Sequence, residues 1–455
     1  MKRKHFLGMI FLGSFAIITA CMKYQLMHEV KAQSSTDGSS PLELYSLAWS
    51  DEFDSSELDT SKWKYRIGIS GNSYQHEDNV TFEDGKLRIN LLTTPYGGMS
   101  YTGGGIITTF PTRYGYYEVS AKMSSKKGWH EAFWTSWMSG FDDQNPAYEG
   151  MDKLEIDCFE HYAEYDEHTF TYGAIEWYPT RGSVSRDYKT VSENLASSYN
   201  TFGFEFTPDY LNYFFNGKLL KTVDTREIPH HDFYLWLSGI AKAQQITDSG
   251  AVFFDYLRYY EISPANYEVR KAPFIAYLDS LKGPAHSAGL DLWMEAEDFK
   301  SLSNWTIEKD DNRKVIKGFT QFDASRDSAA LTASTGIKVN TTGNYRLWVR
   351  ARDFNTAPGT RKFKVKINGQ EAGAVFGNHG VNGYEWQDGG IFNIPGGTTL
   401  VDIFDSSQYS ARCDKILLTT DTAFVPWGIG GSTNVTHYDP PSGFTAAFKM
   451  DEKSR

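Results

Sequence analysis

Apolar and polar residues alternate with a period of two along most of the chain, a pattern typical of β-strands. The clearest case is the segment 210–223, in which two alternating runs flank Asn216-Gly217, a pair that two-residue hairpin turns favour. The segments 345–354 and 361–370 alternate in the same way. No helical period of comparable length appears. The pattern therefore predicts an all-β protein built from sandwiches of antiparallel sheets.

The strand signals fall into two groups, separated by a segment with little β pattern. Residues 42–263 hold the first group and residues 291–422 hold the second, and each is long enough for a β-sandwich. Residues 264–290 are predicted to be a linker, whose apolar stretch can form a short helix that ends by Pro284. Residues 423–455 are predicted to be an extended or loosely ordered tail.

The N-terminal residues have the pattern of an export signal. Three basic residues precede an apolar stretch that is too short to span a bilayer, and the sequence ITAC that follows resembles a bacterial lipobox ending at Cys21. We therefore expect a signal peptide over 1–20, a polar tether over 21–41 and a lipid on Cys21. This predicts an exported lipoprotein at the outer membrane or cell surface of a bacterium. An ordinary secretory signal that contains a cysteine by chance is the alternative.

Composition narrows the classes of partner. The net charge of −12 disfavours a nucleic-acid partner, because phosphate binding favours a basic face. The aromatic fraction of 15% is typical of β proteins and of surfaces that stack on sugars. Cys158 and Cys413 fall in different predicted domains, so we expect neither a disulfide nor a cysteine-based metal site.

One short apolar stretch, LEIDCFEHY at 154–162, carries three acidic residues, Glu155, Asp157 and Glu160. In a regular strand the first two share a face and Glu160 lies on the other. A β-bulge at Cys158-Phe159 would return Glu160 to the first face. Glycoside hydrolysis requires such clustered carboxyl groups, one ionised and one protonated. A calcium site built from the same oxygens is the alternative.

The stretch LEIDCFEHY resembles the E-x-D-x-x-E signature of glycoside hydrolase family 16 in its bulged form. Further motifs follow in the family's order over 45–262: LAWSDEFDSSELDTSKW, YTGGGIITTFPTRYGYYEVSAKM, GWHEAFWTSW, FGFEFTPDYLNYFFNGKLL and FFDYLRYYEI. The resemblance implies a concanavalin-like β-jelly roll that cleaves internal β-linkages of a glucan or galactan with retention and requires no cofactor. It implies Glu155 as nucleophile, Asp157 as its supporting acid and Glu160 as general acid/base.

The resemblance also implies four substrate contacts. Trp129 and Trp134 match the family's cleft tryptophans and would stack on sugar rings. Glu176 stands where a histidine is common, and His76 lies where an arginine is more usual. His130-Glu131 stand where the family prefers proline. These departures leave the substrate open among β-glucan, agar-type galactan and sulfated porphyran-like galactan.

The second group of strands resembles carbohydrate-binding module family 6, a galactose-binding-like β-sandwich. Its first strand, WMEAEDF, and its final third carry the resemblance. Trp386 and Tyr384 are the candidates for stacking on sugar, and Glu295, Glu297 and Asp414 match a region that can hold structural calcium. A packing domain that binds no sugar is the alternative.

Together these expectations describe a monomeric, lipid-anchored endo-β-glycanase that acts on a polysaccharide and carries an appended sugar-binding-like sandwich. A catalytically inactive glycan-binding lipoprotein is the first alternative. A transglycosylase is the second, in which a sugar rather than water intercepts the covalent intermediate.

Overall fold

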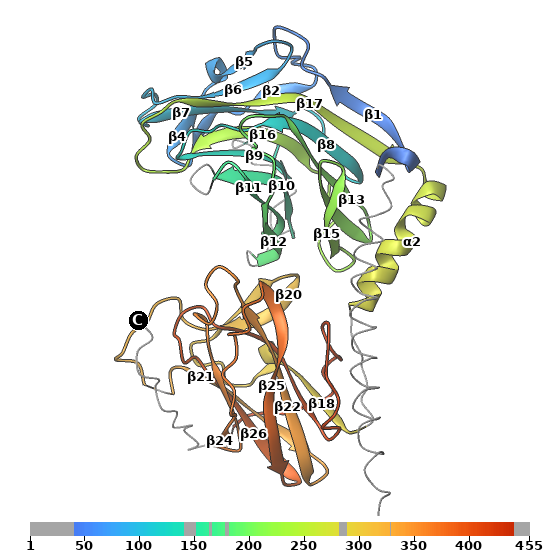
Figure 1. Cartoon of the computed structure of the whole chain (residues 1–455), viewed down its shortest axis with the longest axis vertical. Coiled ribbons are helices and arrows are strands. Elements are labelled where there is room, and N and C mark those ends of the chain that lie inside the picture. Colours follow the sequence, from blue (N-terminus) through green and yellow to red (C-terminus); the bar gives the residue numbers. More distant parts are fainter. Residues whose placement is uncertain are drawn as a thin grey trace, which may run out of the picture. The chain divides into compact units, whose positions relative to one another are not determined.

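The computed structural model describes residues 41–140, 152–162, 166–177, 182–281, 289–327 and 329–440. They divide into two compact units, each described by itself below (Figure 1). Both units consist almost entirely of β-strands, so the all-β prediction is confirmed. The predicted export signal, Cys21 and nearly all of the tether lie outside the described residues. Within these residues, no helix has the length and apolar character needed to cross a membrane.

The first unit is a β-jelly-roll sandwich of two largely antiparallel sheets. Aromatic rings from both sheets meet between them: Phe133 lies 5.7 Å from Phe204 and Phe159 lies 4.5 Å from Phe202, measured between ring centroids. The eight-stranded sheet has the order β15(Lys218–Asp224), β14(Tyr210–Phe215), β13(Asn200–Phe206), β8(Gly115–Lys122), β17(Gly250–Ile262), β6(Leu87–Leu91) and β5(Val80–Phe82), with β1(Tyr45–Asp51) paired to β17.

The nine-stranded sheet carries the acidic stretch. Its order is β12(Gly182–Thr190), β11(Thr169–Glu176), β10(Leu154–Tyr162), β9(Trp129–Ser136), β16(Tyr234–Ala241), β7(Tyr101–Thr108), β4(Ser73–Gln75) and β3(Gly68–Ser70), with β2(Trp63–Tyr65) paired to β7.

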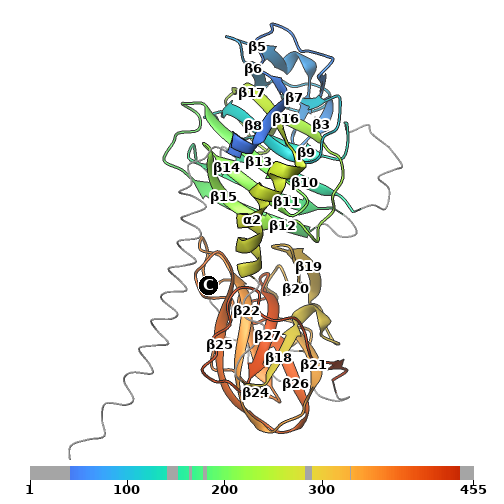
Figure 2. The same ribbon diagram turned by 90° about the vertical axis from the view of Figure 1, so that its right-hand side faces the viewer.

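The predicted linker contains a helix, α2(Pro264–Ser280), which packs on the eight-stranded sheet of the first unit (Figure 2). The Phe274 ring lies 4.7 Å from the Tyr210 ring, and Arg270 donates two hydrogen bonds to the buried carboxylate of Glu205. Residues 264–278 of the predicted linker therefore belong to the first unit.

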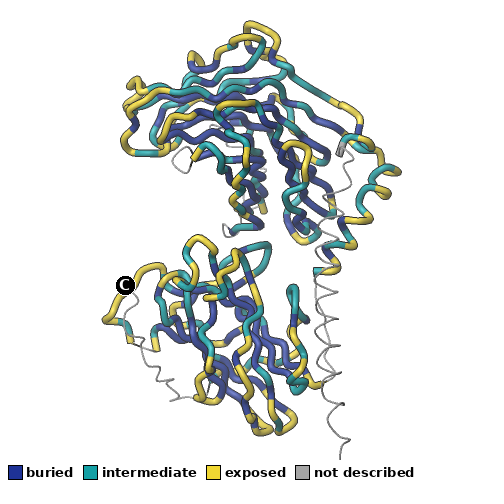
Figure 3. Tube along the Cα trace, viewed as in Figure 1, coloured by how far each residue is buried: buried dark blue, intermediate teal, exposed yellow. Residues whose placement is uncertain are grey.

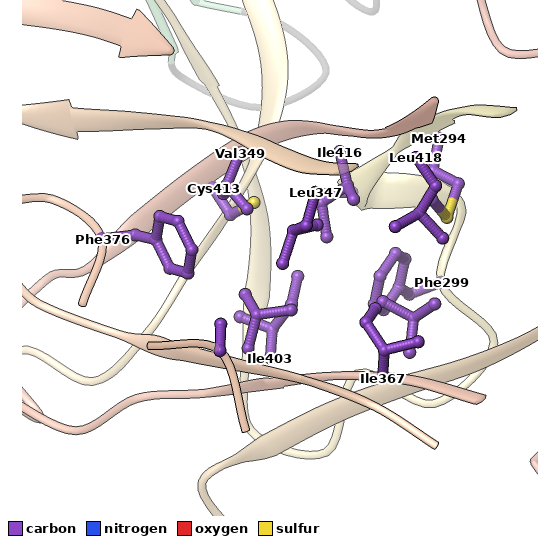
Figure 4. Close-up of a cluster of buried hydrophobic side chains, with 14 of the residues drawn as sticks. Met294, Phe299, Leu347, Val349, Ile367, Phe376, Ile403, Cys413, Ile416 and Leu418 are labelled. Carbon is purple, nitrogen blue, oxygen red and sulfur yellow. The ribbon is translucent and has the colours of Figure 1, made fainter. Parts of the chain in front are cut away.

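The second unit is also a β-sandwich. Its core lies between the two sheets, where Leu347, Val349 and Leu418 face Ile367 and Ile403 (Figure 4). The six-stranded sheet has the order β19(Thr306–Asp310), β20(Arg313–Lys317), β27(Arg412–Thr419), β22(Gly343–Asp353) and β25(Gly383–Ile394), with β18(Asp291–Glu295) paired to β27. The five-stranded sheet has the order β24(Gln370–Glu371), β23(Lys364–Ile367), β26(Gly397–Phe404), β21(Thr332–Val339) and β28(His437–Tyr438).

Residues 423–440 of the predicted tail are largely extended, with only the short strand β28 as regular structure, and they contact the second sandwich. The side-chain oxygen of Asn434 accepts a hydrogen bond from the Trp293 backbone at 2.8 Å, and β28 pairs with β21. Residues 434–438 thus form hydrogen bonds with backbone groups of both β18 and β21. Figure 3 shows that buried residues follow the strands of each unit, whereas the exposed ones gather in the connections.

Candidate active site

Strand β10 contains the predicted β-bulge. Asp157 pairs with Trp134 of β9 and Glu160 pairs with Ala132, and the register shifts between Asp157 and Phe159. Trp134 and Ala132 are two residues apart and share a face of the sheet. Asp157 and Glu160 therefore share that face as well, although they are three residues apart, and the bulge is confirmed.

The three acids lie on one side of this sheet and the apolar residues between them on the other. Ile156, Cys158 and Phe159 are buried, and Phe159 faces the core between the sheets. Glu155 is two residues from Asp157 and shares its face. We call the side that carries Glu155, Asp157 and Glu160 the acid-bearing face. Asp157 is buried there, whereas both glutamates are partly exposed, which suits residues that must meet a substrate.

Glu160 is held by side chains from three strands. The Tyr162 hydroxyl donates to its Oε1 at 2.8 Å, and Nε2 of His130 lies 3.1 Å from the same oxygen. The Thr171 hydroxyl lies 3.3 Å from Oε2. These partners hold the carboxyl group of Glu160 in one direction.

Trp134 lies on the acid-bearing face and is partly exposed. Its indole N–H donates to the Ser238 hydroxyl at 3.1 Å, and its ring lies 4.7 Å from the Trp236 ring. This orientation is compatible with sugar stacking, which stays a prediction.

Arg66, which the sequence did not indicate, packs over both of these tryptophan rings, with its guanidinium carbon 5.7 Å from Trp134 and 5.5 Å from Trp236. Burial lowers the pKa of Arg66 to about 9. Gly105 makes room for it, since a Cβ there would lie 3.0 Å from Arg66 Cδ. A buried cation thus lies against the aromatic residues of this sheet.

The prediction that Trp129 lies in the cleft and stacks on a sugar ring is wrong. Its side chain is fully buried against Leu91 and Ile246, and its indole N–H donates to the backbone carbonyl of Asp248 at 2.9 Å. Because side chains alternate along β9, Trp129 points away from the face that Ala132 and Trp134 share. His130, one position later, points toward the acids instead, as its contact with Glu160 shows.

His76 and Glu176 are at the margins of the same sheet. His76 follows β4 and caps the short 3-10 helix η2(Glu77–Asn79), because its Nδ1 accepts a hydrogen bond from the Asp78 backbone at 3.1 Å. Its ring meets the Tyr96 ring edge-on at 4.5 Å. Glu176 is the last residue of β11, the neighbour of β10. Substrate contact by either residue stays a prediction.

The comparisons with known proteins point to the same region. Residues 70–258 match the family model described as glycosyl hydrolases family 16. This segment carries a family 16 domain. It includes β9, the bulged strand β10 and all residues that surround Glu160.

The curated relatives are distant and cover the chain in part. A "Beta-glucanase" of Acetivibrio thermocellus is 27% identical over 199 residues, which are 44% of this chain and 54% of that protein. A "Keratan-sulfate endo-1,4-beta-galactosidase" of Sphingobacterium multivorum is 28% identical and covers 48% of this chain and 56% of its own. The chain thus spans about half the length of these curated relatives. A laminarinase catalytic domain from Thermotoga petrophila is 22% identical, with a TM-score of 0.41, and covers 48% of this chain and 98% of its own.

The family 16 match ends before the second unit, in which the predicted sugar-stacking residues serve as packing groups. Tyr384 is buried and its hydroxyl donates to Asp310 at 2.8 Å. The prediction that Tyr384 stacks on sugar is therefore wrong. Trp386 is half-buried: its indole N–H donates to the Gly428 carbonyl at 3.0 Å, and its ring meets Trp293 edge-on at 5.8 Å. A Cβ on Gly430 would lie 2.7 Å from the Trp386 ring, so the chain around this glycine lies directly against the ring. Sugar binding by Trp386 stays a prediction.

Two of the three acids that match a calcium region are paired with neighbouring cations. Lys415 lies 2.6 Å from Glu295, and Arg350 lies 2.5 Å from Asp414. Burial raises the pKa of Glu297 to about 8, which favours its neutral form at pH 7. Among the described residues, no group of three His, Cys, Asp or Glu side chains is placed to hold a metal ion. The cations would compete with calcium for these oxygens.

Proposed function

We propose that the family 16 domain is an endo-acting, retaining β-glycanase that cleaves internal β-linkages of a polysaccharide. The observation that carries this proposal is the bulge in β10, which brings Glu160 onto the face that Asp157 and Glu155 occupy. A strand that carried acids only for solubility would need no such device. The half-buried Trp134 beside them offers an aromatic surface for a sugar ring.

In this mechanism Glu155 attacks the anomeric carbon and forms a covalent glycosyl ester, while Glu160 gives its proton to the departing glycosidic oxygen. Water then attacks the same carbon and releases Glu155. Glu160, now ionised, takes the proton from that water. Asp157 lies between the two glutamates in sequence and on their face, where it can share a proton with the nucleophile.

A β-glucan is the first substrate to test, because several curated relatives carry the name "Beta-glucanase". A galactan, neutral or sulfated, is the second, because another relative is named as a keratan-sulfate galactosidase. The overall charge of −12 weakly disfavours the sulfated galactan, and the buried side chain of Arg66 beside Trp134 is not exposed to a sulfate group.

The test is the release of reducing ends by residues 22–455 from laminarin, mixed-linkage glucan, agarose, porphyran, carrageenan and keratan sulfate. We expect one of these polymers to be hydrolysed. We expect Glu155→Gln to lower kcat/KM on it by about three orders of magnitude, because an amide cannot form the covalent ester. Glu57→Gln, an exposed position of the same unit, is the matched control. Binding without hydrolysis by the unmodified protein would favour the inactive glycan-binding alternative, and oligosaccharides longer than the starting chains would favour the transglycosylase.

We also propose that Cys21 carries a lipid and that the protein is an exported, membrane-anchored lipoprotein of a bacterium. The support is the basic and apolar pattern that ends in ITAC. Full-length protein expressed in a bacterium fed radiolabelled palmitate should be labelled and sediment with membranes. Cys21→Ala should lose the label, whereas Cys413→Ala, which removes a buried cysteine, should keep it. A labelled Cys21→Ala protein would contradict the proposal.

A further inference from the structure

His130 contacts the predicted acid/base through a geometry that no motif indicated. Its Nε2 lies 3.1 Å from Glu160 Oε1, and its ring lies 4.4 Å from the Tyr162 ring, whose hydroxyl donates to the same oxygen. Only 10% of the His130 side chain and 17% of the Glu160 side chain are exposed. Hydrogen bonds in such a shielded place are stronger than in water, and their direction is better defined.

The neighbours of the imidazole determine which of its nitrogens carries hydrogen. Nδ1 of His130 is buried and has no hydrogen-bond partner in the described part of the chain. A proton on Nδ1 would leave a buried N–H unpaired, whereas a proton on Nε2 pairs it with a carboxyl oxygen. Nε2 is therefore the donor to Glu160 Oε1.

We propose that His130 is a positioning residue which, together with Tyr162, occupies Glu160 Oε1 with two donated hydrogen bonds and so leaves Oε2 as the oxygen that carries and delivers the catalytic proton. This inference rests on the proposed function and names the oxygen through which it works. Two donated hydrogen bonds stabilise negative charge on Oε1. When Glu160 is protonated, Oε1 is therefore the carbonyl oxygen and the acidic hydrogen is on Oε2. The Thr171 hydroxyl lies 3.3 Å from Oε2 and 3.4 Å from the Glu160 backbone carbonyl; when Oε2 carries the proton, the hydroxyl donates to the carbonyl and accepts from Oε2, and when Glu160 is ionised it can donate to Oε2.

The proton-transfer step balances as follows. The bond between the anomeric carbon and the glycosidic oxygen breaks, a bond from that carbon to a Glu155 oxygen forms, and the Oε2 proton of Glu160 moves to the departing oxygen. His130 keeps its own proton throughout. Its contribution is larger when the leaving group is a poor one, because a leaving group that departs readily as an anion needs no proton.

The surroundings of His130 fix its ring. Ile240 of β16 is its register partner on one side, and Tyr162 lies on the other. Beyond the end of β16, Lys242 lies 5.8 Å from the Tyr162 ring. Glu131 and His161 form a separate pair at 2.6 Å, fully buried on the opposite face. In the described part of the neighbouring strands, the groups facing His130 are thus the Glu160 carboxyl, the Tyr162 phenol and the Ile240 side chain.

The test compares two substrates and two variants of the protein spanning residues 22–455. The substrates are the polymer that the unmodified protein hydrolyses and the 2,4-dinitrophenyl glycoside of its repeating disaccharide. We expect His130→Ala to lower kcat/KM on the polymer by about 10²-fold and on the dinitrophenyl glycoside by less than about 5-fold. We expect His130→Gln, which keeps an N–H donor at a similar reach, to stay within about 5-fold of the unmodified protein on both. His231→Gln, outside the acid-bearing face, is the control.

Each outcome separates this inference from the proposed function. Activity of His130→Ala on the activated glycoside shows that the variant is folded, so its loss on the polymer cannot be attributed to unfolding. Equal losses on both substrates, or a His130→Gln variant as impaired as His130→Ala on the polymer, would overturn the positioning role alone. No hydrolysis of any polymer by the unmodified protein would overturn the proposed function, and this inference with it.

Discussion

Glu160→Ala should lose about 10³- to 10⁴-fold in kcat/KM on the polymer and yet still form the glycosyl ester rapidly from the dinitrophenyl glycoside. The reason is the position of Glu160 on the face of β10 that carries Glu155 and Asp157. An activated leaving group departs without a proton, so only the second step, which needs a base, remains slow. A burst of dinitrophenol followed by a slow steady state is the expected signature.

Azide then distinguishes the roles of the two glutamates. In Glu160→Ala it should enter the space of the lost carboxylate and attack the glycosyl ester on Glu155, which inverts the carbon a second time and gives a β-glycosyl azide. In Glu155→Ala it should attack the substrate itself with one inversion and give an α-glycosyl azide. The anomer is read from the proton NMR spectrum of the product. The same anomer from both variants, or no product from either, would contradict the assignment. Glu57→Ala, the control, should form no glycosyl azide and retain full hydrolytic activity.

The chemistry of β10 could be predicted from the sequence because it depends on local rules. Three acids in nine residues with an irregular spacing conflict with a period of two, and a bulge is the simplest structure that removes the conflict. The register between β10 and β9 confirms that inference. The all-β class followed from the same periodicity.

The side chains around the acids could not be predicted with the same security, because motif matching does not fix the face to which a residue points. Trp129 and His130 are adjacent, so they must lie on opposite faces of β9, and only the pairing with β10 and β16 decides which one meets Glu160. Arg66 was missed for a related reason. It reaches Trp134 from the short segment that follows β2, a contact between residues far apart in sequence.

The attachments of the segments after residues 263 and 423 could not be predicted, because composition says little about long-range contacts. Glycines and prolines after residue 423 suggested a loose tail, yet Asn434 bonds to the first strand of the second unit. The segment after residue 263 suggested a linker, yet its helix places Arg270 on a buried glutamate of the first unit. In both cases a polar side chain contributes to the attachment, and it does so through a partner far away in the sequence.

That second attachment leads to the largest stability effect that we expect. Glu205 is fully buried in β13 and accepts hydrogen bonds from Arg270 of α2 at 3.0 and 2.9 Å. It also accepts from the side chains of Tyr45, Tyr210 and Asn212 at 2.7, 2.8 and 3.0 Å. Burial opposes the charge of Arg270, but the carboxylate of Glu205 outweighs it and raises the pKa of Arg270 above its usual value. Among the described residues, the charge on Glu205 therefore has one largely buried cation and three neutral donors around it.

Arg270→Met should lower the free energy of unfolding of the first unit by about 3–5 kcal/mol, because it leaves the Glu205 charge buried without its cation. Methionine keeps most of the aliphatic stem, so the loss reports on the charge rather than on packing. Urea unfolding of the protein, followed by loss of hydrolytic activity, isolates the transition of the unit that carries the acids.

Two further variants separate the buried pair from ion pairs in general. Arg113→Met removes the partner of Asp232 in an ion pair whose side chains are 42% and 53% exposed, and it should change stability by less than about 1 kcal/mol. Glu205→Gln combined with Arg270→Met should recover part of the loss, because the amide carries no charge to leave unpaired and still accepts from Tyr45 and Tyr210. If Arg270→Met changed the free energy of unfolding as little as Arg113→Met, the proposed role of the buried charge would be contradicted. The contact of Phe274 with Tyr210 would then be what holds α2 to the sheet.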